Sequence, residues 1–192
     1  MSLALRRPMT LEAFLAWEER QDQRWEFDGF QPVAMTGGTV EHEIIGNNVR
    51  TALQNRLAGQ KCRVFGPTMK IEVAGRIRYP DAFVFRGVPP RGGTVLHDPI
   101  VVFEVLSQST SRIDRLEKFN EYRATTSIQR YVLLEQEAAA AMIFVRKSNE
   151  FVVETAAADA ILSMPEIGID IPLAEFHLGL DLPPPAEVMD AV

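Results

Sequence analysis

Cysteine is nearly absent from this chain, because Cys62 is the only one among 192 residues. A single cysteine cannot form an intramolecular disulfide and cannot build a cysteine-rich zinc site. Since Cys62 begins an apolar run, we expect it to be a small core residue on a strand rather than a nucleophile. The lack of disulfides fits a reducing compartment, and we expect a cytoplasmic location.

Long apolar segments are also missing. No run approaches the roughly 18 residues that would span a membrane. Arg6 and Arg7 near the N-terminus are not followed by the apolar stretch of a secretory signal. We therefore expect a soluble protein with no membrane partner.

The chain shows neither an internal repeat nor a break in composition that would divide it. We expect a single domain over residues 10–180. The segment 1–9 and the acidic, proline-rich tail at 181–192 are expected to be flexible.

Negative charge exceeds positive charge, with a formal net charge of -6, which argues against binding nucleic acid through bulk electrostatics. The excess is uneven, because residues 1–75 sum to 0, residues 76–130 to +3 and residues 131–192 to -9. The middle segment is therefore the part that could face a polyanion. An excess of this size is also common on ordinary solvated surfaces.

Helical periodicity is clearest between Val40 and Leu57, where apolar residues recur at three- and four-residue steps and Gly59 can end the helix. Segments rich in β-branched and aromatic residues follow, separated by glycine or proline breaks, and predict strands. They cover residues 62–65, 69–73, 77–85 and 100–106. Helical spacing returns over 111–124, and a further apolar strand is predicted at 131–134.

A short helix and two hairpins extend this core. Thr10 can cap a helix that reaches Trp17, an Asp28-Gly29 turn predicts a hairpin, and residues 139–155 predict a final hairpin. Together the patterns predict an α/β fold with a mixed β-sheet flanked by helices. Its core order is helix, three strands, helix, strand (α-β-β-β-α-β).

Two carboxylates stand where the apolar pattern breaks. Glu104 interrupts a central strand, where burying a charge is unfavourable unless a partner compensates it, and Asp81 follows Tyr79-Pro80 at the start of another apolar run. If the two strands are neighbours, both carboxylates can converge on a divalent cation such as Mg²⁺. The alternative is that Asp81 is a turn residue and that Glu104 pairs with an arginine.

Asp114, Lys118 and Tyr122 are spaced four residues apart and would share one face of the next helix. This helix could bring the Lys118 ammonium group toward the two carboxylates. There it could orient or help deprotonate an attacking water and stabilise charge on a phosphate. The alternative is an exposed Asp–Lys pair with Tyr122 packing on the sheet.

These residues carry a resemblance to a known family. The matching segments are Trp25-Glu26-Phe27-Asp28-Gly29, His42, Tyr79-Pro80-Asp81, Phe103 to Ser107, Ser109-Thr110, Asp114, Lys118, Tyr122 and Tyr131-Val132-Leu133. In them the chain resembles the Uma-two (Uma2) family over most of residues 10–180. The resemblance implies a restriction-endonuclease-like fold of the PD-(D/E)XK nuclease superfamily.

The resemblance also implies that Asp81 and Glu104 bind Mg²⁺ or Mn²⁺. The sequence departs from the superfamily pattern two residues after Glu104, where Leu106 stands in place of the signature lysine, and Lys118 is the expected replacement. Candidate accessory residues, which could add a ligand or an acid/base group, are His42, Glu26, Glu43, Asp114 and Tyr122.

From the residues and the resemblance together we expect a metal-dependent endonuclease that hydrolyses DNA phosphodiester bonds, with Asp81, Glu104 and Lys118 as catalytic residues. Two alternatives stay open: a catalytically inactive interaction module with the nuclease fold, and a metal-dependent hydrolase of a smaller phosphate ester. The family, and the strands that would lie at a sheet edge, also favour a homodimer.

Overall fold

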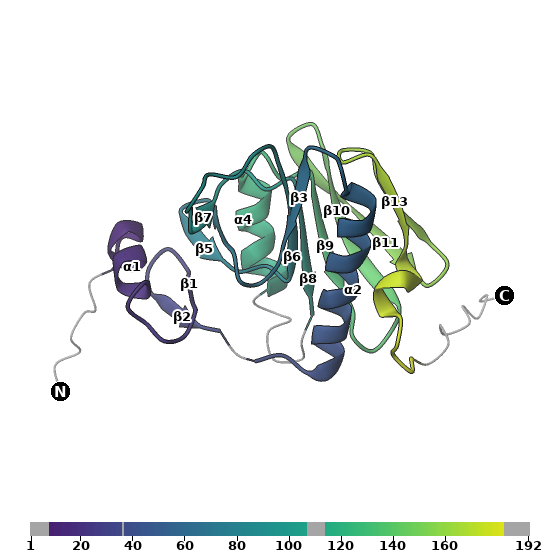
Figure 1. Ribbon diagram of the computed structural model, residues 1–192, viewed down its shortest axis with the longest axis horizontal. Helices are drawn as coiled ribbons and strands as arrows, with labels where there is room; N and C mark the ends of the chain where they lie inside the picture. Colours follow the sequence, from purple (N-terminus) through teal and green to yellow (C-terminus); the bar gives the residue numbers. More distant parts are fainter. Residues whose placement is uncertain (1–7, 36, 107–113, 183–192) are drawn as a thin grey trace.

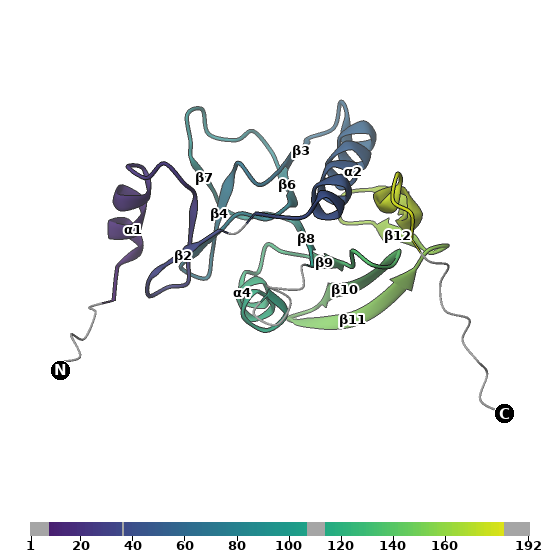
Figure 2. The same ribbon diagram turned by 90° about the horizontal axis from the view of Figure 1, so that it is seen from below.

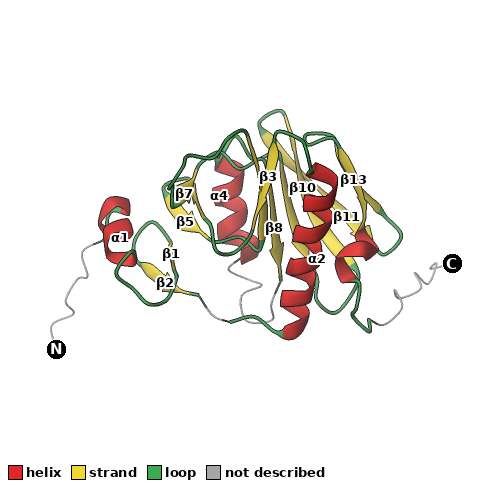
Figure 3. Cartoon of the chain, in the orientation of Figure 1, coloured by secondary structure: helices red, strands yellow, loops and turns green. Residues whose placement is uncertain are grey.

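The centre of the computed structural model, which describes residues 8–35, 37–106 and 114–182, is a six-stranded mixed sheet (Figures 1 and 3). In spatial order its strands are β11 (Glu150–Ala157), β10 (Ala140–Lys147), β9 (Arg130–Leu134), β8 (Val101–Val105), β6 (Ala82–Arg86) and β3 (Cys62–Phe65). Strands β8 and β9 are parallel, and the other neighbours are antiparallel.

Two smaller sheets flank the central one. The five-stranded sheet has the order β2 (Pro32–Ala34), β1 (Trp25–Phe27), β5 (Arg76–Arg78), β4 (Lys70–Val73) and β7 (Val95–Leu96). The third sheet is the hairpin of β12 (Ile161–Met164) and β13 (Ile169–Pro172).

Helices cover both faces of the six-stranded sheet, with α2 (Val40–Leu57) on one face and α4 (Phe119–Ala124) on the other (Figure 2). A π-helical turn, η1 (Asp114–Lys118), leads into α4, and α1 (Leu11–Glu18) packs with the N-terminal strands. A 3-10 helix, η2 (Leu173–His177), lies against α2. In the described part of the chain no helix combines the length and the hydropathy needed to cross a membrane.

Side-chain alternation in β8 divides the core into two clusters. Val101, Phe103 and Val105 pack with α2 and with the β12–β13 hairpin. Val102 points to the other face and packs with Tyr122 of α4. Because side chains alternate along a strand, Glu104 belongs to the face of Val102, the face that α4 covers. Every residue of β8 is buried, as expected for a central strand covered on both sides.

Much of the predicted fold is confirmed. The helix over Val40–Leu57 has the predicted bounds, and the Thr10 hydroxyl caps α1 by accepting from the Ala13 N–H at 3.1 Å. Strands β1 and β2 pair as the predicted hairpin, and β10 and β11 pair as the predicted final one. Most of the predicted flexible termini 1–9 and 181–192, namely residues 1–7 and 183–192, and residues 111–113 of the predicted second helix lie outside the described residues.

One expectation about the strands is wrong. The run 77–85 is not one strand, because it divides into the end of β5 and most of β6, which belong to different sheets. Pro80 separates them, since a proline has no backbone N–H to donate to a sheet. The predicted mixed sheet flanked by helices is present as the six-stranded sheet, and the β12–β13 hairpin was not predicted.

Candidate functional site

Asp81 lies in the break between β5 and β6, directly before the first residue of β6. Strand β6 pairs antiparallel with β8 in a register that joins Ala82 to Phe103, and the same register continued by one residue sets Asp81 opposite Glu104. The Val105 N–H donates to Asp81 Oδ2 at 2.7 Å, which fixes the carboxylate beside the end of β8. Because Val105 directly follows Glu104, this hydrogen bond places the Asp81 carboxylate beside the part of β8 that carries Glu104.

Helix α2 presents His42, Gly46 and Arg50, which are spaced four residues apart, toward Asp81. His42 Nε2 lies 2.8 Å from Asp81 Oδ1, and Arg50 Nη1 donates to the Asp81 backbone oxygen at 3.2 Å. Gly46 lies against Asp81, since a Cβ atom there would be in ordinary contact with the Asp81 Cβ at 4.0 Å. The helix therefore holds both the side chain and the main chain of Asp81.

Glu104 is only 5% exposed, and two donors meet its Oε1 atom. Lys118 Nζ lies 3.0 Å away and the Tyr122 hydroxyl 2.9 Å away. These charge-assisted hydrogen bonds offset the loss of hydration that a buried carboxylate suffers. Lys118 and Tyr122 thus share a helical face, and the side chain of Asp114, the third residue of the predicted face, lies outside the described residues.

Glu26 brings a third carboxylate to the same region from β1. Its Oε1 atom lies 3.8 Å from Lys118 Nζ and accepts from the Tyr79 N–H, while its Oε2 atom accepts from Arg78 at 3.0 Å. Burial alone would raise the pKa of Glu26, but the charges of Lys118 and Arg78 and these hydrogen bonds outweigh it, so the pKa is lowered. Glu26 is therefore ionised at neutral pH and linked to Lys118.

Arg78 ties this cluster to α4. Its guanidinium donates two hydrogen bonds to the Glu121 carboxylate, at 2.7 and 2.6 Å, and both side chains are 4% exposed. A bidentate pair of this kind fixes the relative position of its two elements. Strand β5 is thereby anchored to the helix that carries Tyr122.

The pKa values of His42, which contacts Asp81, and of Tyr122, which contacts Glu104, are both raised. The hydrogen bond with Asp81 raises the pKa of His42 above its usual value, against the opposing effect of burial, and the charges of Asp81 and Glu104 add to it. Burial raises the pKa of Tyr122 well above its usual value, and the charge of Glu104 acts in the same direction. Tyr122 therefore keeps its proton at neutral pH and acts as a donor.

The structure places the remaining candidates apart from the two carboxylates. Glu43 is exposed and pairs with Arg50 at 3.0 Å. Leu106, which stands in place of the signature lysine, is a buried core residue. Two arginines of the basic middle segment, Arg78 and Arg130, are buried against the carboxylates of Glu121 and Glu166 and are not available to a polyanion.

Sequence reasoning missed Arg50, Arg78 and Glu121. Arg50 stands one helical turn after Gly46 and two turns after His42, and this stripe of small and polar residues is the signal that could have revealed it. Nothing in the local pattern distinguishes Arg78 or Glu121 from surface residues, because their pairing depends on a contact between distant segments.

The arrangement could provide two protein ligands for a divalent cation, not a complete shell. In the ranges that the structure describes, no group of three His, Cys, Asp or Glu side chains could hold a metal ion. Mg²⁺ commonly takes one or two carboxylates and completes its shell with water and substrate phosphate oxygens. The carboxylates of Asp81 and Glu104 offer ligands of that type.

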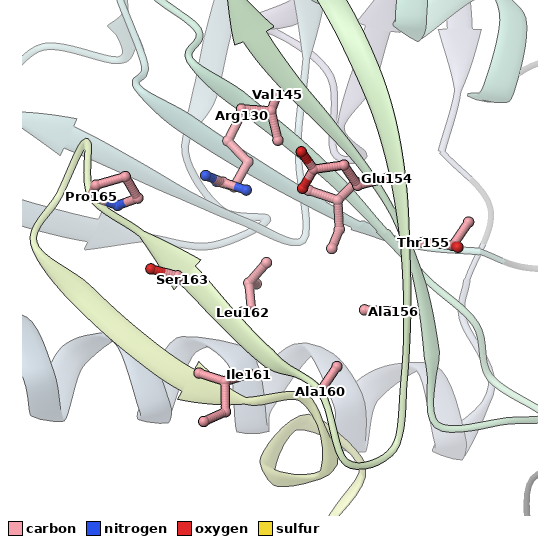
Figure 4. Close-up of a pocket in the computed structure, with 11 residues that line it drawn as sticks. Arg130, Val145, Glu154, Thr155, Ala156, Ala160, Ile161, Leu162, Ser163 and Pro165 are labelled. Carbon is pink, nitrogen blue, oxygen red and sulfur yellow. The ribbon is translucent and has the colours of Figure 1, made fainter.

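A separate pocket of about 390 Å³ lies between β11 and β12 (Figure 4). Arg130 contributes to its wall, but its guanidinium is bound to Glu166 at 2.5 and 3.2 Å. Arg130 pairs with Val101 at the start of β8, whereas Glu104 is near the end of that strand. The pocket wall also includes Ile143 and Val145 of the core cluster on the α2 side, whereas Glu104 belongs to the face that α4 covers.

Comparison with solved structures identifies the class of fold. A crystal structure described as a "putative nuclease belonging to DUF820" from Anabaena variabilis aligns with a TM-score of 0.73 at 15% identity. The alignment covers 88% of this chain and 98% of that chain. The chain therefore has the α/β fold of that protein, and the predicted fold class is confirmed.

Comparison with family models identifies the family. The model described as "Putative restriction endonuclease" (Uma2) matches residues 11–174, and the chain belongs to the Uma2 family. Two uncharacterized proteins of Synechocystis sp. are also similar. The protein slr1290 is 29% identical over 173 residues, which are 88% of this chain and 91% of the relative. The protein sll1609 is 25% identical over 141 residues, 71% and 80% of the two chains.

Proposed function

We propose that the chain is a metal-dependent endonuclease that hydrolyses DNA phosphodiester bonds, with Asp81 and Glu104 holding Mg²⁺ or Mn²⁺. The proposal is carried by the register of β6 and β8, which continued by one residue sets Asp81 opposite Glu104, and by the Lys118 ammonium 3.0 Å from Glu104 Oε1. Membership of a family described as restriction endonucleases supports DNA as the substrate.

The residues of the site would have different roles in the reaction. A bound divalent cation supplies an acidified water and shields the charge of the phosphate. Lys118, whose ammonium group lies 3.0 Å from Glu104 and 3.8 Å from Glu26, would orient the attacking water by donating a hydrogen bond to it. Tyr122 donates to Glu104 Oε1 and fixes the direction in which that carboxylate points.

His42 and Glu26 act on this site through other residues. His42 orients the Asp81 carboxylate by the contact to Oδ1, and Glu26 positions the Lys118 ammonium from the side away from Glu104. Neither needs to touch the substrate for these roles. We propose them as positioning residues.

A catalytically inactive interaction module is the second candidate function. The observation that favours it is that the Asp81 carboxylate is bonded to His42 and Val105, while Glu104 is bonded to Lys118 and Tyr122. Both carboxylates are thus satisfied by the protein itself. A metal-dependent hydrolase of a smaller phosphate ester would use the same groups, and a generic phosphodiester substrate distinguishes it from the nuclease.

Cleavage of supercoiled plasmid in Mn²⁺ or Mg²⁺ tests the proposal. We expect the wild type to cut, and Asp81→Ala and Glu104→Ala from the same purification to lose at least about a hundredfold in rate. Lys118→Gln should lose about 10²–10⁴-fold. Arg91→Gln, at an exposed loop position, is the control and should cut like the wild type. A wild type that does not cut, or variants that all cut equally, would favour the interaction module.

A further inference from the structure

Arg50 extends from α2 to the edge of the candidate site. Its guanidinium donates to the Asp81 backbone oxygen at 3.2 Å through Nη1 and to Glu43 Oε1 at 3.0 Å through Nη2. The side chain is 18% exposed, so part of it reaches solvent. A guanidinium has five N–H donors, and these two hydrogen bonds leave others able to bind an oxyanion.

Two glycines make room for this side chain. A Cβ atom at Gly66 would lie 2.7 Å from Arg50 Cδ, closer than real Cβ contacts allow, and one at Gly46 would lie 3.2 Å from Arg50 Nη1. Neither glycine has a positive φ, so backbone conformation does not account for them. The space they leave determines where the guanidinium lies.

The pairing of Arg50 differs from that of the buried arginines. Arg78 and Arg130 are held by carboxylates that are themselves 4% and 14% exposed. The carboxylate partner of Arg50 is Glu43, whose side chain is 71% exposed. Exposed ion pairs contribute about 0–1 kcal/mol, so Glu43 can be replaced by another anion at little cost.

We propose that Arg50 binds a backbone phosphate of the nucleic acid beside Asp81, and that Glu43 holds the guanidinium until the phosphate replaces it. The inference rests on the proposed function, because it names the substrate contact of the same site. Arginine suits this role because its planar group can give a phosphate two parallel hydrogen bonds. The Asp81 carbonyl fixes the guanidinium in place before the substrate arrives.

Fluorescence anisotropy of a labelled DNA duplex, titrated with the full chain in Ca²⁺, measures this contact without requiring cleavage. We expect Arg50→Gln to weaken binding by about tenfold or more. It should also lower the slope of log affinity against log salt by about 1. Arg50→Lys should bind with intermediate affinity, because it keeps the charge but loses the planar group. The charge-matched control is Arg91→Gln.

The role of Glu43 is tested by a double-mutant cycle. Glu43→Gln should tighten DNA binding several-fold in the wild-type background, because the guanidinium is then free, and should have no effect in the Arg50→Gln background. If Glu43 simply repels DNA, Glu43→Gln would tighten binding equally in both backgrounds. That result would overturn the proposal that the phosphate replaces Glu43 on Arg50. Glu19→Gln, exposed at the end of α1, controls for the change in net charge.

The result for Arg50 can be separated from the result for the nuclease. If the wild type cuts plasmid and Arg50→Gln binds DNA like Arg91→Gln, the phosphate contact is wrong and the proposed function stands. If Arg50→Gln loses Mn²⁺ binding in calorimetry but not DNA affinity, Arg50 only supports Asp81 and the inference also fails. If the wild type neither binds nor cuts DNA, both proposals fail.

Discussion

At the scale of single residues, the main feature of the candidate site is the set of buried charges around Lys118. Lys118, Glu104 and Glu26 bring one cation and two carboxylates together, all 13% exposed or less as side chains. Burying charges in this way is unfavourable unless each finds a partner, and breaking such a cluster by removing one member is more damaging than its net stabilisation indicates. The cluster therefore favours one arrangement of β1, β8 and η1.

Glu26→Gln should reduce the stability of the fold in a pH-dependent way. The pKa of Glu26 is lowered by folding, so its ionised form contributes stability above its unfolded pKa, and this contribution is lost as the pH falls through the lower folded value. We expect the variant to be about 1–3 kcal/mol less stable at pH 7. The difference should hold down to about pH 5 and shrink below about pH 4.5.

Urea unfolding of wild type and variant at several pH values measures this difference. Glu19→Gln, an exposed change of the same kind, should alter stability at pH 7 by less than about 0.5 kcal/mol. A difference for Glu26→Gln that stays constant into acid would show that the carboxylate charge is not responsible. The link between Glu26 and Lys118 would then be wrong.

Some residues of the candidate site could be predicted from the sequence, and others could not. Glu104 stood out because a carboxylate interrupts an apolar strand, and Lys118 and Tyr122 could be placed on one helical face by their spacing. The contact between Lys118 and Glu26 could not be foreseen, since it depends on how the five-stranded sheet meets α4. Arg50 was missed because its importance comes from its tertiary neighbours rather than from its place on α2.

At the scale of elements, the break at Pro80 determines where the site forms. Because β5 and β6 belong to different sheets, the chain turns at Tyr79-Pro80-Asp81, and Asp81 emerges at the start of β6 opposite Glu104. The composition of residues 77–85 correctly predicted β-strand. It did not reveal that the segment divides into two strands of different sheets. Composition reports burial on a sheet, whereas the choice of sheet is decided by partners distant in sequence.

Gly66→Ala tests the packing between this turn region and α2. The added methyl group would contact Arg50 Cδ and displace the guanidinium from the Asp81 carbonyl. We expect a loss of about 1–3 kcal/mol of stability, measured by urea unfolding, as for overpacked sites. Cleavage should fall with it, because Asp81 loses a support.

Gly37→Ala is the matched control for this substitution. A Cβ atom there has nothing within 4 Å, so its stability should change by less than about 0.5 kcal/mol. If Gly66→Ala is as stable and as active as Gly37→Ala, the space at Gly66 does not determine where Arg50 lies. The role of Gly66 in making room for Arg50 would then be incorrect.

At the scale of the whole molecule, the homodimer stays a prediction. Strand β11 is eight residues long and forms one edge of the six-stranded sheet, and its Val152 and Val153 are 40% and 55% exposed. A long exposed edge of this kind favours pairing with a second copy. Sedimentation equilibrium should therefore give twice the chain mass of 21.5 kDa.

Val153→Lys should shift that equilibrium to the monomer, because it places two like charges near the proposed contact. Val88→Lys, at a position 92% exposed in a loop, should leave the dimer intact. A wild type that sediments as a monomer at all concentrations would contradict the prediction. The candidate site would be unaffected, since all of its contacts lie within one chain.

The central claim is that Asp81 and Glu104 together hold a divalent cation, and Mn²⁺ binding followed by electron paramagnetic resonance tests it most directly. We expect the wild type to bind about one equivalent of Mn²⁺. Asp81→Asn and Glu104→Gln, which keep the shape of each side chain, should each weaken that binding by at least about tenfold. A wild type that binds no Mn²⁺, or variants that bind it as tightly as the wild type, would contradict the account.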